Sequence, residues 1–207
     1  MGNEYGLDAK EWRTLKALKR PGDVQRFLDE DVAYNVEPDG PTCLSPRQAL
    51  RQMRAHCMEG AMLAALALRV QGHPPLLLDL ESVRDDDHVL AVFQVDGCWG
   101  AVAKSNYSGL RYREPVYRSL RELVMSYFAN YYNLQGEHTL RAYSTRPVDL
   151  SRFDRQGWMT SEVDIWYVPE FLCGVGHTKL LKPGQERRLA LMDKRLFEAG
   201  LVGRVEH

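Results

Sequence analysis

The amino-acid sequence predicts an α+β protein, with a helical N-terminal half packed on a small antiparallel sheet. In the N-terminal half, apolar residues recur three and four positions apart, which is typical of helices. Further on, Asp96-Gly97 separates two apolar runs and is a strong short signal for a β-hairpin. A chain of 207 residues suits a single domain, and it is long enough to bury a core without disulfide bonds.

Two short helices are expected first, one over residues 8–19 and one from Pro21 onwards. Their apolar faces comprise Trp12, Leu15 and Leu18 in the first helix and Val24, Phe27 and Leu28 in the second. Residues 31–43 are rich in turn formers. This segment is predicted to be a surface loop, and the alternative is that it forms one wall of an active site.

A third helix is predicted to start at Ser45 and to run to about Ala55. Ser45 can cap it, Pro46 suits the first helical position, and Gln48 completes a capping box. Gln52 on this helix is a candidate substrate-binding residue, because a side-chain amide can help to hold an oxyanion. The simpler interpretation of Gln52 is a solvated helix face.

The strongest helix signal runs from Cys57 to Arg69 and ends before Gly72. Cys57 would lie in the first turn, where unpaired N–H groups and the positive end of the helix dipole favour the thiolate. The alternative is that Cys57 is a small buried residue, because free cysteines are often buried. His56 is not assigned as a base, since neighbouring residues on a helix do not face the same way.

Three strands should follow, at residues 76–80, 88–95 and 98–105. Both faces of the third strand carry apolar residues, which predicts a sheet covered on both sides. The acidic run Asp85-Asp86-Asp87 lies between the first two strands and fits no metal-binding loop. It is therefore expected to be a solvated turn.

The hairpin also predicts which side chains share a face. With a two-residue turn, Val95 pairs with Cys98, and counting outwards places His88 opposite Ser105. Directly opposite residues have Cβ atoms roughly 5 Å apart. Ser105 is therefore predicted to orient the His88 ring, and Asn106 is the alternative if a β-bulge rotates it onto that face.

Trp99 is expected to pack in the core or to shield a nearby nucleophile from water, so it is a second candidate substrate-binding residue. Later elements are expected to be a helix from Ser119 to about Asn133, an extended segment over 139–150, a strand over 161–168, and an amphipathic helix within 183–202.

The stretch around Cys57 resembles the transglutaminase-like (papain-like cysteine) superfamily. Members of this superfamily have a cysteine that opens a helix, a helix face of small residues, and then an arginine, a glycine and a proline before the first strand. The matching positions in this sequence are Cys57, Ala61, Leu66, Arg69, Gly72 and Pro74. His88 follows at a strand start, in the family's order. The resemblance covers about residues 45–106 and implies a papain/transglutaminase-like core, with 107–207 as C-terminal helix and strand additions to a single domain.

The resemblance implies a cysteine-nucleophile acyl-transfer enzyme, either an amide or peptide hydrolase or a transamidase. Cys57 would attack a carbonyl, and His88 would move the proton. Ser105 or Asn106 would orient His88, although the family has an aspartate where Ser105 stands. That difference favours the alternative, a non-catalytic protein- or ligand-binding scaffold with a degenerate triad. The substrate would be a peptide, a protein or a small amide.

Composition limits the other function classes. The formal net charge is −1, which argues against nucleic acid or an anionic membrane surface as partners. The four cysteines have no metal-ligand spacing, and a metal held by Cys57 and His88 would lack two further ligands. No cofactor is expected. Neither a signal peptide nor a membrane-spanning run is recognisable, so a cytoplasmic location is expected.

Overall fold

The computed structural model describes residues 5–206 and confirms the α+β class. Its main sheet is antiparallel throughout and has seven strands, so it is larger than expected. The strand order is β6-β5-β4-β3-β7-β9, and β8 also pairs with β3. The strands are β3 (Leu76–Ser82), β4 (His88–Val95), β5 (Cys98–Val102), β6 (Arg113–Tyr117), β7 (Leu140–Ser144), β8 (Val148–Asp149) and β9 (His177–Lys179). A separate parallel pair joins β1 (Ala33–Tyr34) to β2 (Arg54–Ala55).

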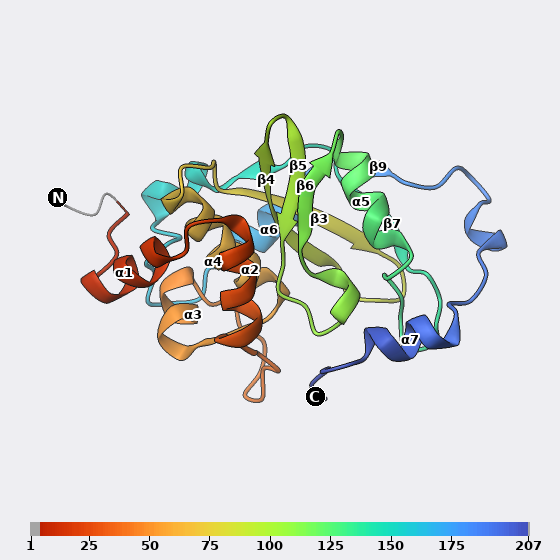
Figure 1. Cartoon of the computed structure of the whole chain (residues 1–207), viewed down its shortest axis with the longest axis horizontal. Helices are drawn as coiled ribbons and strands as arrows, with labels where there is room; N and C mark the ends of the chain where they lie inside the picture. Colours follow the sequence, from red (N-terminus) through yellow and green to blue (C-terminus); the bar gives the residue numbers. More distant parts are fainter. Residues whose placement is uncertain (1–4, 207) are drawn as a thin grey trace.

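Helices cover both faces of this sheet (Figure 1). They are α1 (Ala9–Ala17), α2 (Pro21–Glu30), α3 (Pro46–Gln52), α4 (Cys57–Val70), α5 (Leu120–Phe128), α6 (Tyr167–Cys173) and α7 (Lys194–Gly200). Three short 3-10 turns are η1 (Ser108–Leu110), η2 (Leu150–Gln156) and η3 (Glu186–Arg188). None of the helices in the described part of the chain has the length and apolar character needed to cross a bilayer.

Alternate residues of the strands build two separate cores. Leu77 and Val89 belong to the larger core, which contains the buried face of α4. Leu78 and Leu90, their neighbours in sequence, belong to the smaller core beneath α5. Because successive strand residues point to opposite faces, the sheet is apolar on both sides, as predicted for a covered sheet.

Helix α4 is nearly all buried and lies against the sheet. Gly60 permits this close approach, because a Cβ at that position would collide with the Cβ of Lys104. The Lys104 ammonium group donates hydrogen bonds to the carbonyls of Leu28 and Val32, at the end of α2. Burial lowers the pKa of this amine to about 8. These contacts fasten the start of α4, the sheet and α2 together.

The hairpin between β4 and β5 has the predicted turn and register. Asp96 and Gly97 have φ values of 50° and 78°, as a type I′ turn requires, and Val95 pairs with Cys98. However, the ladder with β5 ends at Ala91 and Val102, so residues 103–106 leave the sheet. The predicted pairing of His88 with Ser105 lies beyond that end, and the ladder partner of His88 is Leu80 on β3.

Three elements differ from the sequence-based expectation. Helix α3 stops at Gln52 because Met53 is left-handed, with φ 50°, and the next two residues pair with β1. The helix predicted to reach Asn133 ends at Phe128. The amphipathic helix expected within 183–202 is present as α7. The strand predicted over 161–168 is wrong, because this segment forms turns and then enters α6.

Candidate active site

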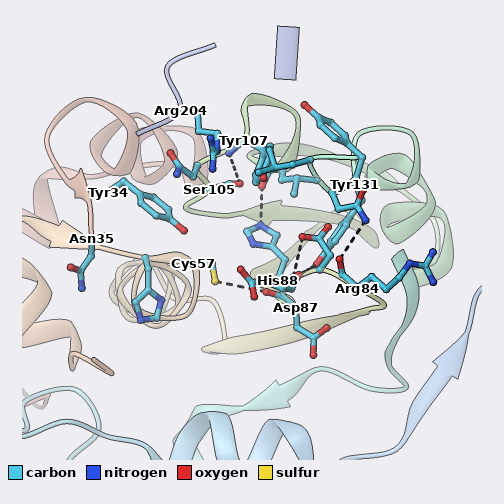
Figure 2. A pocket seen from close by; sticks show the side chains of 18 of the residues that line it. Tyr34, Asn35, Cys57, Arg84, Asp87, His88, Ser105, Tyr107, Tyr131 and Arg204 are labelled. Atoms are coloured by element: carbon cyan, nitrogen blue, oxygen red, sulfur yellow. Dashed lines mark hydrogen bonds between the residues drawn. The ribbon is translucent and has the colours of Figure 1, made fainter. Parts of the chain in front are cut away.

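A pocket of about 520 Å³ lies where the start of α4 meets the end of the sheet at which β4 begins. Four of the predicted site residues line it, namely Cys57, His88, Ser105 and Asn106. Figure 2 shows the Cys57 sulfur beside the His88 ring, with the loop before β4 below them. The fold therefore brings together residues that are up to 49 positions apart in the chain.

Cys57 is the first residue of α4, and its sulfur contacts the Asp87 carbonyl oxygen at 4.0 Å. Burial by itself would raise the pKa of this thiol, but the neighbouring His56 and His88 rings outweigh burial and lower the pKa to about 6. Cys43 provides the contrast within the same protein, because burial raises the pKa of that thiol to about 12. Cys57 is thus the thiol whose surroundings favour the thiolate.

His56 is the N-cap of α4 and lines the same pocket. His56 was not assigned as a base because neighbouring residues on a helix face different ways. Its extended backbone lies outside the helix, so that argument does not apply to it. Nδ1 accepts the Met58 N–H at 3.2 Å, and Nε2 donates to the Thr42 carbonyl at 3.0 Å, which is the bonding of a neutral ring. Burial disfavours a second proton, but the Cys57 thiolate and the Glu59 carboxylate raise the pKa of His56 to about 9. Protonation of Nδ1 would replace the cap bond with a positive charge near the sulfur.

Glu59 holds this helix start in place, and its side chain is fully buried. Its carboxylate accepts hydrogen bonds from the N–H groups of His56 and Leu44, both at 2.9 Å. It also accepts from the Thr42 hydroxyl at 2.7 Å and from the Asn35 amide at 3.0 Å. One carboxylate therefore ties the 35–44 loop to the first turn of α4, which carries Cys57. The spacing of a capping box, with glutamate three residues after the cap, was the signal that could have identified it.

His88 begins β4 and is buried. Its Nε2 lies 3.0 Å from the carbonyl oxygen of Leu110 in η1. A carbonyl can only accept, so Nε2 carries the proton and Nδ1 of the neutral ring is left as the basic nitrogen. Tyr131 packs edge-on against the ring, with centroids 6.5 Å apart, and its hydroxyl donates to the Asp86 carbonyl at 2.7 Å.

The orienting acceptor is therefore the Leu110 carbonyl, where Ser105 or Asn106 had been expected. The Ser105 hydroxyl accepts the Tyr107 N–H at 3.0 Å, which stabilises a local turn. The Asn106 amide makes two hydrogen bonds to the backbone of Val205. Both residues line the pocket, but within residues 5–206 their hydrogen bonds do not go to the His88 ring. Sequence reasoning missed Leu110 because a backbone acceptor has no residue-type signature.

The two predicted substrate-binding residues lie away from the pocket. Trp99 is next to the hairpin turn, opposite Tyr117 of β6, at the other end of β4 from His88. The exposed side chain of Gln52 accepts a hydrogen bond from Arg54 at 2.9 Å. Neither residue lines the pocket. The structure therefore does not bring Trp99 and Gln52 together with Cys57 and His88 in this pocket.

Tyrosines form much of the pocket wall, which includes Tyr34, Tyr107, Tyr131 and Tyr132. Burial raises the pKa of Tyr34 and Tyr131, so both phenols remain neutral near physiological pH. The acidic run before β4 is built into this wall, where Asp85 accepts from the Thr139 hydroxyl at 2.6 Å. In the described residues, no group of three or more histidine, cysteine or acidic side chains is placed to hold a metal ion.

No protein-family model matches the chain, and comparison with the curated proteins finds no match. The function of the pocket is therefore inferred from the residues that form it.

Proposed function

We propose that this protein is a cysteine-nucleophile acyl-transfer enzyme of transglutaminase-like type, acting on an amide or ester carbonyl. The observation that carries the proposal is that Cys57, at the start of a helix, shares a pocket with the ring of His88, whose Nε2 is held by a backbone carbonyl. A nucleophile, a base and a group that orients the base are the three parts that covalent acyl transfer requires.

The chemistry follows from the protonation states. Nδ1 of His88 takes the thiol proton, and the sulfur of Cys57 attacks the carbonyl carbon. The carbon–nitrogen bond then breaks, the imidazolium protonates the leaving amine, and a thioester remains. Water or an amine attacks the thioester and restores the thiol. The N–H groups in the first turn of α4 have no partner within the helix, and that of Cys57 is suited to hold the oxyanion.

The missing aspartate does not exclude this mechanism. A neutral acceptor orients the histidine in the Cys-His-Asn arrangement of papain-like proteases. The Leu110 carbonyl offers the same kind of acceptor to Nε2 of His88. It fixes the tautomer without a charge, so the imidazolium gains less stabilisation than it would beside a carboxylate. This absence of a charged partner is also what favours the alternative, a non-catalytic scaffold that binds a protein or ligand.

Alkylation by iodoacetamide at a series of pH values tests the proposal. In the wild-type protein, the rate at Cys57 should be half-maximal near pH 6, because its pKa is about 6. Replacing His88 with alanine removes one of the two imidazoles that stabilise the thiolate. The midpoint should therefore move toward the ordinary thiol pKa of about 8.5, and the rate near pH 6 should fall about tenfold.

The exposed Cys173 is an internal control, since both peptides are quantified in the same digest by mass spectrometry. Its rate profile should be the same in the wild-type protein and in the His88→Ala variant. If Cys57 is alkylated no faster than Cys173 at low pH, and His88→Ala changes nothing, the protein is a scaffold and the proposal is wrong.

A further inference from the structure

The segment formed by residues 194–206, here called the strap, runs along one side of the candidate pocket. It contains α7, after which the chain turns back toward the middle of the molecule (Figure 1). The Tyr132 hydroxyl donates to the Phe197 carbonyl at 3.0 Å, and the Ser108 hydroxyl donates to the Ala199 carbonyl at 2.8 Å. Gly200 lies so close to the Tyr132 hydroxyl that a Cβ would not fit there. The strap is therefore closely seated on the residues around the pocket.

Beyond α7, the side-chain amide of Asn106 makes two hydrogen bonds to a single residue of the strap. Nδ2 donates to the Val205 carbonyl at 2.8 Å, and Oδ1 accepts the Val205 N–H at 2.8 Å. A neighbouring β-strand offers the same pair of donor and acceptor to an extended chain. Asn106 itself is only 7% exposed, so its amide is held within the wall of the pocket.

These hydrogen bonds reach only backbone atoms of the strap. Tyr132, Ser108 and Asn106 bind carbonyl or N–H groups, which every non-proline residue has. The side chain of Arg204 contributes a different kind of contact, because it lines the pocket with its guanidinium 5.9 Å from the Tyr107 ring centre (Figure 2). The amide of Asn106 would therefore hold the backbone of another extended peptide as well as it holds Val205.

We propose that Asn106 is a backbone-binding subsite for an extended polypeptide substrate, and that the strap occupies this subsite as an intramolecular competitor. The inference rests on the proposed function and narrows its substrate from amides in general to polypeptides. Asn106 lines the same pocket as Cys57 and His88, so a peptide bound by its amide enters the pocket that holds the reacting groups. The strap must leave before such a peptide can bind.

Two alkylating probes separate peptide recognition from thiol reactivity. One is iodoacetamide, and the other is a tetra-alanine peptide carrying an iodoacetyl group at its N-terminus. The ratio of their rate constants at Cys57 measures how much the peptide backbone contributes. Both rate constants are measured near pH 9, where even an unactivated thiol with a pKa of about 8.5 is mostly ionised. The ratio of the two rate constants can therefore be measured whether or not Cys57 is catalytic.

Val205→Pro removes the N–H that Asn106 binds and should detach the end of the strap from Asn106 while leaving Asn106 intact. The ratio should then rise about tenfold over that of the full-length wild-type chain, in keeping with the loss of two competing hydrogen bonds. Val205→Ala retains the backbone N–H and should leave the ratio unchanged. Asn106→Ala also frees the strap but removes the subsite, so its ratio should not exceed that of the wild type.

If the ratio of the two rate constants in Val205→Pro equals that of the wild type, the strap does not compete with the peptide probe. An equal rise in Val205→Pro and Asn106→Ala would mean that the strap blocks access sterically and that Asn106 does not bind the peptide. Either result would overturn the inference while leaving the low-pH reactivity of Cys57 untouched. Conversely, loss of that reactivity alone would contradict the proposed enzyme but not the peptide subsite.

Discussion

The Cys57 sulfur interacts with two histidines that belong to different parts of the fold. His88 comes from a strand, and its ring is fixed by a backbone carbonyl. His56 comes from the cap of the same helix as Cys57, and its ring is held by the first turn and by the 35–44 loop. At the residue scale, the thiolate therefore depends on both the start of α4 and the start of β4.

The substitution His56→Asn distinguishes the capping of α4 by His56 from the effect of its imidazole on the pKa of Cys57. Asparagine is a good N-cap, so the stability of the protein should change little. The imidazole that helps to lower the pKa of Cys57 is lost, so the midpoint of the pH profile of alkylation should rise by about one unit. His56→Ala is the matched control, and it should show the same rise together with a loss of about 1 kcal/mol of stability from the missing cap. An unchanged midpoint in His56→Asn would show that His56 only caps the helix.

At the scale of the element, the position of α4 depends on one residue without a side chain. Gly60 lies in the first turns of the helix, against the Cβ of Lys104, and this is the contact that brings the helix close to the chain just after β5. The Lys104 amine in turn binds the carbonyls at the end of α2. A displacement at Gly60 would therefore move Cys57 relative to the sheet that carries His88.

Gly60→Ala should destabilise the protein by about 1–3 kcal/mol, because overpacking outweighs the better helix propensity of alanine. It should also slow low-pH alkylation of Cys57 by moving the sulfur away from His88. Gly22→Ala, in α2, is the matched control, since a Cβ there has ordinary space and its nearest contact is the Tyr112 hydroxyl at 3.9 Å. The control should be neutral or stabilising by up to about 1 kcal/mol in urea unfolding. Equal stability changes in both variants would contradict the close-approach argument.

At the scale of the whole molecule, an ion pair joins the end of α4 to the C-terminal half of the chain. Arg69 binds both carboxylate oxygens of Asp154, at 2.6 and 2.7 Å. Asp154 also accepts a hydrogen bond from the fully buried Trp158 at 3.0 Å. The hydrogen bond from Arg69 lowers the pKa of the Asp154 carboxyl below its usual value of 3.8.

Asp154→Asn should cost about 1 kcal/mol near neutral pH, a modest value because the pair is partly open to solvent. A carboxyl whose pKa is lower in the folded state stabilises that state at pH values above the unfolded pKa. The stabilisation is lost as the pH falls through the lowered pKa, so the difference between the wild type and Asp154→Asn should shrink below about pH 3.8. Urea unfolding at several pH values measures this difference, and a gap that persists in strong acid would contradict the assignment.

Local chemistry in the sequence was sufficient to predict much of the fold. The cap at Ser45 marks a helix start, and Pro21 opens α2 as expected from its fixed φ. The turn at Asp96-Gly97 set the hairpin register, because only a few residue types tolerate positive φ. Each of these signals acts over a few residues, which is why it is visible in the sequence itself.

The working details of the pocket were decided by tertiary structure. The carbonyl that holds His88 is 22 residues away in the chain, and Asn106 and its partner Val205 are 99 residues apart. Glu59 binds groups up to 24 residues before it. Backbone acceptors and long-range pairings have no local pattern of residue types. The sequence could therefore nominate Cys57 and His88, and its capping-box spacing could point to Glu59, but it could not indicate which carbonyl orients His88 or which segment covers the pocket.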